Sequence, residues 1–559
     1  MAIDLNPRTN VARSMNGMLA NDATHAFQSW SHLMQVRDAE GERPWMIYVD
    51  ASGRRTVWSY AVFIDVARRI ATLLVTNGVG TGDRVAIAGH NHPDTILQYF
   101  ACWMIGACAV PLNMTEDDAR LSYILSASKT RIVFCRSEYR NRIVAALGAY
   151  NLEHAVQILE VDTDSADPEF YATVRACNPH PWDDVPIDRR FDDCLLVYTS
   201  GTTGNPKGVV LMQQNLFADA CEIGSWHGIG KETRMMCVLP VHHVNGTIVT
   251  TVTPFVAGSS VVLQRKFSAT SFFDTIKAEG VHLVSVVPTL LAFLLEAKAD
   301  ASDILASGFR HFICGAGPLT VELATAFEER YGLRIVHGYG LSETTCYSCF
   351  LPLDLSWDQH RSWMKDYGFP SIGVPLPCNE MAIHDASGNP VPEGERGEIV
   401  IRGVSVMREY DTRPEANEDC FAFGWFRSGD EGFMKVSSDG RTYFFITGRL
   451  KELIIRGGVN LAPLEIDEVL AGAPGVKAGI CVGFPNNMYG EEVGALVVSD
   501  GSAKEEAILA YCSERLPFHK RPKVVVFTTE LPVTSTGKYQ RNKVKHLFDA
   551  YLDVQFRQQ

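Results

Sequence analysis

The sequence predicts an α/β protein with more than one domain, and three observations support this. Strand patterns alternate with helix patterns up to about residue 394. The texture then changes to short alternating runs with many turn residues up to about residue 447, and a mixed pattern follows Gly448. A chain of 559 residues is also too long for one hydrophobic core, because single cores stop growing at about 250–300 residues.

The first repeating unit spans residues 83–112. Residues 83–89 form an apolar run entered from a Gly-Asp turn, which is typical of a buried strand. A helix pattern at 93–105 begins with Pro93, a residue suited to a first helical turn, and a short apolar strand follows at 107–112. This order favours a parallel sheet covered by helices. Further strand patterns occur at residues 131–135, 194–198, 283–287 and 312–315.

The two later parts of the chain have different patterns. Alternating runs at 398–402 and 441–446 predict a small β-rich subdomain at about 394–447. Beyond Gly448, a helix pattern at 463–470 and strand patterns at 478–482 and 493–498 predict an α+β domain. The remaining stretch, 448–559, is the size of a compact separate domain.

Composition narrows the function. The net charge of −14 argues against nucleic acid as a partner, because binding a phosphate backbone needs a basic surface. The start of the chain lacks a signal-peptide pattern, so we expect a cytoplasmic protein whose 14 cysteines are reduced. Cys346 and Cys349 have C-x-x-C spacing without a second matching pair, which disfavours a zinc or redox site. The apolar run 96–112 is better explained by a buried helix and strand than by a membrane span.

The segment 199–208 predicts a phosphate-binding loop. It follows a strand pattern and packs four hydroxyl residues, three glycines and one lysine into ten positions. Glycines allow close backbone approach, and hydroxyl and N–H groups donate to phosphate oxygens. It is not a Walker loop, because Pro206 precedes the lysine and Gly208 follows it. The candidate ligand-binding residues are Thr199, Ser200, Gly201, Thr202, Thr203, Gly204 and Lys207.

Four further segments carry candidate residues, and each taken singly has a plain structural alternative. Residues 337–345 include Glu343, a hard-oxygen donor suited to Mg²⁺, but they also fit a strand entering a capped helix. Residues 425–432 place Asp430 on a glycine-flanked turn, where it could accept hydrogen bonds from a sugar or simply close a hairpin. Segments 448–460 and 531–541 contain Lys451 and Lys538, and either lysine taken alone is typical of a solvent-exposed surface residue.

In this order, the five segments resemble the adenylate-forming superfamily of acyl- and aryl-CoA ligases, peptide-synthetase adenylation domains and luciferases. The resemblance runs from the strand at residue 83 to Arg541, most of the chain. It implies an N-terminal α/β body at 1–447 with a small β-barrel subdomain, and a mobile α+β C-terminal domain at 448–559 that rotates about Lys451. It also implies ATP, Mg²⁺ and CoA as cofactors.

The resemblance assigns roles at the nucleotide site. The loop at 199–208 would clasp the β- and γ-phosphates, Glu343 would ligate Mg²⁺ and Thr344 would contact the α-phosphate. Tyr339 would stack near adenine, and Asp430 would bind the ribose hydroxyls with help from Arg449. Further residues implied around the nucleotide are Gly315, Ala316, Gly338 and Gly340.

The implied reaction has two steps. A carboxylic acid and ATP give acyl-AMP and pyrophosphate, and the acyl group then passes to a thiol. Lys538 would reach the acyl carboxylate and the α-phosphate in the first step, where a cation stabilises developing charge. Gly458 would leave room for the pantetheine arm in the second. We expect CoA as the acceptor, with a separate carrier protein or another nucleophile as the alternative. A third hypothesis is a non-catalytic protein that binds nucleotide as a sensor. We expect the protein to be a monomer or a homodimer.

The candidate acyl pocket lies around residues 240–246. His243 occupies the position of the family's common histidine, and His242 replaces the usual aromatic residue. No aspartate follows at the position that α-amino-acid activators use, so an α-amino acid is disfavoured. Side chains of modest size would leave room for an aryl or medium-length acyl group. The candidate pocket residues are His242, Asn245, Gly246 and Cys346, joined by Thr247 and Gly338.

Two departures from the family pattern flank Asp430. Ser428 replaces the common threonine and keeps its hydroxyl, whereas Glu431 replaces a common leucine next to the proposed nucleotide site. The sequence offers no explanation for Glu431.

Overall fold

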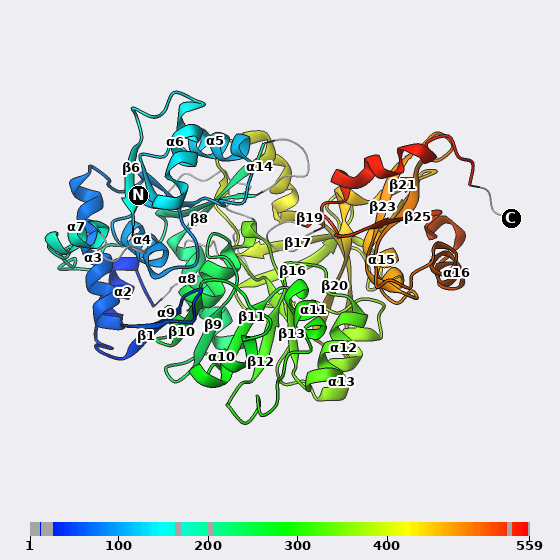
Figure 1. The fold of residues 1–559 in the computed structure, drawn as a ribbon, viewed down its shortest axis with the longest axis horizontal. Helices are drawn as coiled ribbons and strands as arrows, with labels where there is room; N and C mark the ends of the chain where they lie inside the picture. The colour runs from blue at the N-terminus through cyan, green and yellow to red at the C-terminus, as the bar shows by residue number, and fades with distance from the viewer. Residues whose placement is uncertain (1–11, 13–25, 163–168, 200–204, 534–538, 557–559) are drawn as a thin grey trace.

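A computed structural model describes residues 12, 26–162, 169–199, 205–533 and 539–556 (Figure 1). Within these residues the chain forms two large sheets covered by helices, a small antiparallel sheet, and a C-terminal sheet with its own helices. Figure 1 shows the C-terminal sheet and its helices as a lobe at one end of the molecule. The predicted fold class, an α/β body with a β-rich subdomain and an α+β C-terminal part, is confirmed.

One large sheet carries the predicted phosphate loop. Its order is β18-β8-β7-β4-β3-β5-β6, and its central strands pair in parallel. The strands are β3 (Arg84–Ala88), β4 (Cys108–Pro111), β5 (Ile132–Arg136), β6 (Gln157–Val161), β7 (Asp193–Thr199), β8 (Lys207–Met212) and β18 (Glu409–Tyr410).

The other large sheet has the order β15-β14-β13-β12-β11-β9-β10-β1-β2 and is parallel from β1 to β13. Its strands are β1 (Pro44–Val49), β2 (Arg55–Ser59), β9 (Arg234–Cys237), β10 (Ser260–Gln264), β11 (Leu283–Val286), β12 (His311–Cys314), β13 (Ile335–Tyr339), β14 (Cys349–Phe350) and β15 (Val374–Pro375).

The small sheet is antiparallel, in the order β16-β17-β19-β20. Its strands are β16 (Asn379–His384), β17 (Gly397–Gly403), β19 (Phe426–Val436) and β20 (Thr442–Arg449). The C-terminal sheet contains β21 (Ile454–Arg456), β22 (Val459–Leu461), β23 (Val476–Asn486), β24 (Gly490–Ser499) and β25 (Val524–Thr528). The domain bounds 1–447 and 448–559, and the subdomain bounds 394–447, stay predictions.

Helices cover the sheets, and α4 shows why the sequence folds as it does. Every residue of α4 is buried, Pro93 occupies its first turn, and the His92 side chain accepts the Asp94 N–H as an N-cap. The helices are α2 (Trp30–Asp38), α3 (Tyr60–Thr76), α4 (Pro93–Met104), α5 (Asp118–Ala127), α6 (Arg140–Gly148), α7 (Glu169–Ala176), α8 (Gln213–Trp226), α9 (Thr253–Val256), α10 (Phe272–Glu279), α11 (Pro288–Glu296), α12 (Val321–Tyr331), α13 (Trp357–Lys365), α14 (Pro414–Cys420), α15 (Pro463–Ala471) and α16 (Glu505–Arg515).

The apolar run at 96–112 forms most of α4 and all of β4, as predicted. Across the described ranges, no helix combines the length and apolar character that crossing a membrane requires.

Candidate functional site

The predicted phosphate loop connects β7 to β8. The two strands pair antiparallel, with Thr199 opposite Lys207, so both ends of the loop lie side by side. The Lys207 Nζ lies 4.5 Å from the centroid of the Tyr410 ring. The remaining predicted loop residues, Ser200, Gly201, Thr202, Thr203 and Gly204, lie outside the described residues.

Glu343 lies on a short 3₁₀ turn, Ser342–Thr344, that follows β13. Its Oε1 accepts a hydrogen bond from the Tyr410 hydroxyl at 2.8 Å, and its backbone carbonyl accepts from the Met407 N–H at 2.8 Å. The neighbouring Thr344 is buried, and its Oγ1 accepts from the Leu341 N–H at 3.1 Å. Glu343 is therefore fixed from two sides by residues at 407–410, which no sequence motif had indicated.

A strained turn shapes the chain just after Glu343. Thr345 has φ of 68°, and the Cys346 N–H donates to the Thr344 carbonyl at 2.8 Å, which defines a γ-turn. Gly340 accommodates this turn, since a Cβ there would lie 1.9 Å from the Cys346 carbonyl oxygen. A left-handed conformation at a β-branched residue is costly, and such strain clusters at functional sites.

Glu343 fits the Mg²⁺ site that the resemblance implies. In the described part of the chain, no group of three or more His, Cys, Asp and Glu residues could hold a metal ion. Mg²⁺ in nucleotide sites is usually held by one or two carboxylates together with substrate phosphates and water. Glu343, which contacts the same Tyr410 side chain as Lys207, matches that requirement.

The structure brings Tyr339, Asp430 and Arg449 together although they are far apart in the sequence. The Tyr339 hydroxyl donates to Asp430 Oδ2 at 2.6 Å, and Arg449 Nε lies 3.3 Å from Asp430 Oδ1. Asp430 is only 2% exposed. Burial raises the pKa of Tyr339 well above its usual value, and the Asp430 charge adds to this. Asp430 is therefore a buried carboxyl group held from two sides by the Tyr339 phenol and the Arg449 guanidinium.

The two departures beside Asp430 have structural explanations. Ser428 Oγ accepts the Asp430 N–H at 3.0 Å, so the hydroxyl still shapes the turn. Glu431 Oε2 accepts from Thr447 Oγ1 at 2.6 Å and lies 3.6 Å from Arg396. Glu431 therefore tethers β19 to β20 and does not face Asp430's partners.

The chain packs closely at the ends of β12 and β13, where residues 315–316, Gly338 and residues 347–350 meet. Ala316 has φ of 64°, an uncommon conformation for a residue with a Cβ. A Cβ on Gly315 would lie 2.7 Å from the Gly338 carbonyl oxygen and 2.7 Å from Tyr347 Oη. A Cβ on Gly338 would lie 2.3 Å from the Phe350 ring. The glycines predicted at this site are required by packing.

Asn245 belongs to a buried polar cluster that sequence reasoning had only partly identified. It begins a π-helix, Asn245–Val252, and its Nδ2 donates to Tyr347 Oη at 3.2 Å. Ser285 Oγ, within β11, donates to Asn245 Oδ1 at 2.8 Å. All three side chains are buried. Ser285 was missed because it lies in an apolar stretch typical of a core strand, and Tyr347 because it lies just beyond the motif at 337–345.

The two candidate histidines lie next to the predicted phosphate loop. The His242 and His243 rings lie 4.4 Å apart, and both line one cavity with Tyr198 and Pro206, which flank the phosphate loop. Burial lowers the pKa of His242 to about 4, so its imidazole is neutral near pH 7. A Cβ on Gly246 would lie 2.3 Å from the Pro240 carbonyl oxygen, so this position requires glycine.

Cys346 and Cys349 are buried free thiols. Burial raises the pKa of both thiols above the usual value, which makes them poor nucleophiles.

The C-terminal candidates lie just beyond β20. Lys451 is exposed on a 3₁₀ turn, Leu450–Glu452, directly after Arg449. Gly458 has φ of 84° and is exposed, with no atom within 4 Å of a Cβ placed there. Lys538 lies outside the described residues.

Charged groups and close-packed glycines at strand ends of an α/β body are typical of a nucleotide-binding enzyme. The sequence profile of the family described as "AMP-binding enzyme" matches residues 35–411, and that of its C-terminal domain matches residues 465–538. The chain therefore belongs to the family of AMP-binding enzymes, and the predicted membership of the adenylate-forming superfamily is confirmed.

Individual relatives are CoA ligases. The chain is 35% identical over 533 residues to a sulfoacetate–CoA ligase of Cupriavidus necator, covering 94% of this chain and 99% of the relative. It is 34% identical to a feruloyl-CoA synthase of an Amycolatopsis species, covering 87% and 94%. The crystal structure of ATP-bound MatB from Rhodopseudomonas palustris superposes with a TM-score of 0.82 at 27% identity, covering 93% and 99% of the two chains.

Proposed function

We propose that this chain converts a short, polar carboxylic acid to its CoA thioester through an acyl-adenylate. The reaction class is that of an AMP-forming acid–CoA ligase, and the cosubstrates are ATP and CoA. In the first step a carboxylate oxygen attacks the α-phosphorus of ATP and pyrophosphate leaves. In the second, the thiol sulfur of CoA attacks the acyl carbon, AMP leaves, and the thiol proton is lost.

The geometry around Asp430 and Glu343 supports the proposed nucleotide roles. Asp430 would accept hydrogen bonds from the two ribose hydroxyls, since Tyr339 and Arg449 already hold its carboxylate in a fixed orientation. Glu343 would hold Mg²⁺, which when bound neutralises charge on the phosphate oxygens. Lys207 would pair with phosphate oxygens at the end of the loop. These assignments are supported by the convergence of the three segments at the strand ends.

The second step would use residues from the C-terminal part. Rotation about Lys451 would withdraw Lys538 from the site and bring Gly458 to the channel for pantetheine. The open space around Gly458 supports this role, because a side chain there would occupy it. Closure in each orientation would also exclude water from the reactive anhydride.

The buried Asn245–Ser285–Tyr347 cluster carries the proposal of a short, polar acid. The Tyr347 phenol packs directly against the Gly315 backbone, and we infer that it limits the length of the acyl group. Its hydroxyl and the Asn245 amide keep hydrogen-bonding capacity in a buried place. The three side chains hydrogen-bond one another, so a polar acid can exchange into this network, whereas an apolar chain that disrupts it costs about 1–3 kcal/mol for each bond lost.

The relatives agree with this choice in part. The sulfoacetate–CoA ligase acts on a short acid with a second anionic group, whereas the feruloyl-CoA synthase acts on an aryl acid. We favour the short acid because of the volume that Tyr347 fills.

The test is acid-dependent pyrophosphate exchange, followed by thioester formation with CoA, across a panel of sulfoacetate, oxalate, ferulate and octanoate. We expect exchange with the short polar acids only. Tyr347→Ala should admit the longer acids, whereas Tyr347→Phe, which keeps the ring, should not. Ferulate or octanoate activation by the wild type would contradict the proposed acid, and exchange without a CoA product would favour a carrier protein as acceptor.

A further inference from the structure

Tyr410 lies between the two groups of opposite charge at the phosphate site. Its hydroxyl donates to Glu343 Oε1 at 2.8 Å, and its ring lies under Lys207 Nζ at 4.5 Å. Tyr410 is 7% exposed, and burial raises the pKa of its hydroxyl well above the usual range, with the Glu343 charge adding to the effect. The phenol is therefore a neutral donor to the carboxylate and, through its ring, a partner for the ammonium.

Among the described residues, Lys207 and Glu343 form no ion pair with each other, and each contacts the same phenol. Opposite charges in a partly buried site attract strongly because the local dielectric is low. A direct pair would use the carboxylate and ammonium that a metal–nucleotide complex needs. Each would then have to be released before the nucleotide could bind.

The backbone around Tyr410 is held rigidly. Its N–H donates to Asn417 Oδ1 at 2.7 Å, and its carbonyl accepts from Asn417 Nδ2 at 2.9 Å. The next residue, Asp411, receives two hydrogen bonds from the Arg84 guanidinium at 2.8 and 2.7 Å. The Asp411 N–H donates to the Gly208 carbonyl at 2.7 Å, immediately after Lys207.

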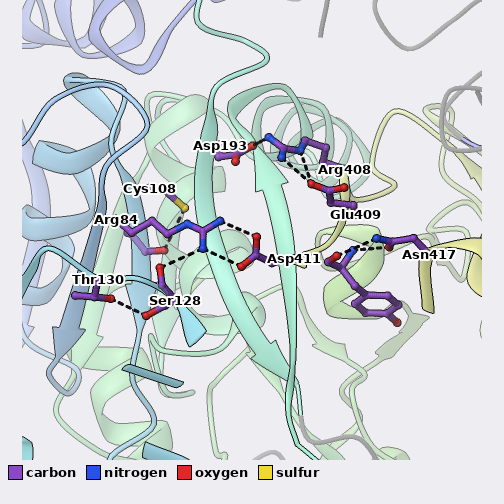
Figure 2. Close-up of polar contacts among 11 residues, drawn as sticks. Arg84, Cys108, Ser128, Thr130, Asp193, Arg408, Glu409, Asp411 and Asn417 are labelled. Atoms are coloured by element: carbon purple, nitrogen blue, oxygen red, sulfur yellow. Dashed lines mark hydrogen bonds and ion pairs between the residues drawn. The ribbon is translucent and has the colours of Figure 1, made fainter. Parts of the chain in front are cut away.

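A second arginine holds the other side of the same two-residue strand. Arg408 donates to Asp193 Oδ1 at 2.6 Å and to Glu409 Oε1 at 2.7 Å. Figure 2 shows the Arg84–Asp411 pair, the Arg408 group and Asn417 arranged around β18 and its neighbouring strands. These charge-assisted hydrogen bonds on both sides of β18 are expected if the Tyr410 side chain must keep one position.

We propose that Tyr410 is a positioning residue that keeps Lys207 and Glu343 apart and oriented before the metal–nucleotide complex binds. The inference rests on the proposed function, because it assigns ATP phosphates and Mg²⁺ to those two groups. Tyr410 itself takes part in no bond making or breaking. It acts by leaving Glu343 free to accept a cation and Lys207 free to accept a phosphate.

The test measures ATP binding to the full chain by calorimetry, once with excess EDTA and once over a Mg²⁺ titration. Tyr410→Phe keeps the ring under Lys207 and removes the bond to Glu343. It should raise the Mg²⁺ concentration for half-maximal binding by about tenfold, the order of one charge-assisted hydrogen bond, and leave metal-free ATP binding within about twofold. Tyr410→Ala should also weaken metal-free binding by about fivefold or more, because Lys207 and Glu343 can then pair.

The exposed Tyr150, which is 47% exposed, provides the matched control, and Tyr150→Phe should change neither titration. If Tyr410→Phe weakens binding equally with and without Mg²⁺, or changes neither, the positioning role is wrong. If Tyr410→Ala does not fold, Tyr410→Phe decides alone. Wild-type protein that binds no ATP would overturn the proposed function together with this inference, whereas ATP binding with an unaltered Mg²⁺ response in Tyr410→Phe would overturn only the inference.

Discussion

The contact between α15 and α12 should weaken as the pH rises, because it buries a carboxyl group. Both oxygens of Glu468 accept the Val321 N–H, at 3.3 and 3.0 Å, at the start of α12. Burial raises the pKa of Glu468 from 4.5 to about 8, with the charges of Asp467 and Glu322 adding to the effect and the Val321 N–H opposing it.

The direction follows from proton binding. Between pH 4.5 and about pH 8, Glu468 keeps a proton while the contact is formed and loses it when the contact opens. Raising the pH through this window therefore favours the open state. The full cost is about 5 kcal/mol, and about 2 kcal/mol of it falls between pH 6 and pH 8, roughly a 50-fold change in the contact equilibrium.

The assay is hydrogen exchange of the α12 first-turn amides at pH 6 and pH 8, corrected for the intrinsic rates. Wild-type protection should fall by about 50-fold over this range. Glu468→Gln still presents an amide oxygen to Val321 but cannot ionise, so its protection should change by less than about threefold. Glu514→Gln, at an exposed glutamate on α16, serves as the control. An equal loss of protection in wild type and Glu468→Gln would refute the reasoning.

Three substitutions test the nucleotide and acyl sites. Asp430→Asn should raise the KM for ATP by about 10–100-fold, the range for losing a hydrogen bond to a charged group, and an unchanged KM would remove Asp430 from the ribose site. Gly315→Ala would place a Cβ 2.7 Å from Tyr347 Oη, so urea unfolding should show a loss of about 1–3 kcal/mol. Unchanged stability would mean that the ring moves aside. Lys538→Ala should lower acyl-adenylate formation by about 100-fold or more and spare thioester formation from supplied acyl-adenylate; equal loss of both would contradict the domain rotation.

The sequence predicted the fold well because its signals are local. Buried parallel strands are continuous apolar runs, and turn residues bound them, so β3, α4 and β4 appear within a few residues of the predicted ranges. The candidate site was predicted through its glycines and hydroxyls. Gly315, Gly338 and Gly340 each stand where a Cβ would collide with neighbouring backbone or side chains.

Contacts between distant segments had no such signal. Tyr410 lies in a two-residue strand with no glycine or repeated hydroxyl around it, and its contact with Glu343 spans 67 positions. Ser285 lies within the apolar strand β11, where the sequence indicates core, and Tyr347 lies just beyond the motif at 337–345. Glu431 looked out of place because its partners Thr447 and Arg396 come from other strands or turns. Side-chain pairing across the sheet decides these roles, and no window of sequence contains both partners.

The γ-turn at Thr345 shows how a local backbone conformation depends on a contact between distant segments. A left-handed conformation at a β-branched residue costs about 1–3 kcal/mol, so a local preference would never place threonine there. It persists because Thr345 Oγ1 donates to the Ser405 carbonyl at 2.6 Å, and because Gly340 leaves room for the Cys346 carbonyl. The hydrogen bond from Thr345 to Ser405 connects the turn to the chain segment that leads to Tyr410. The strain therefore fixes Glu343 against the residue that we propose orients it, and the local geometry makes sense only through that distant contact.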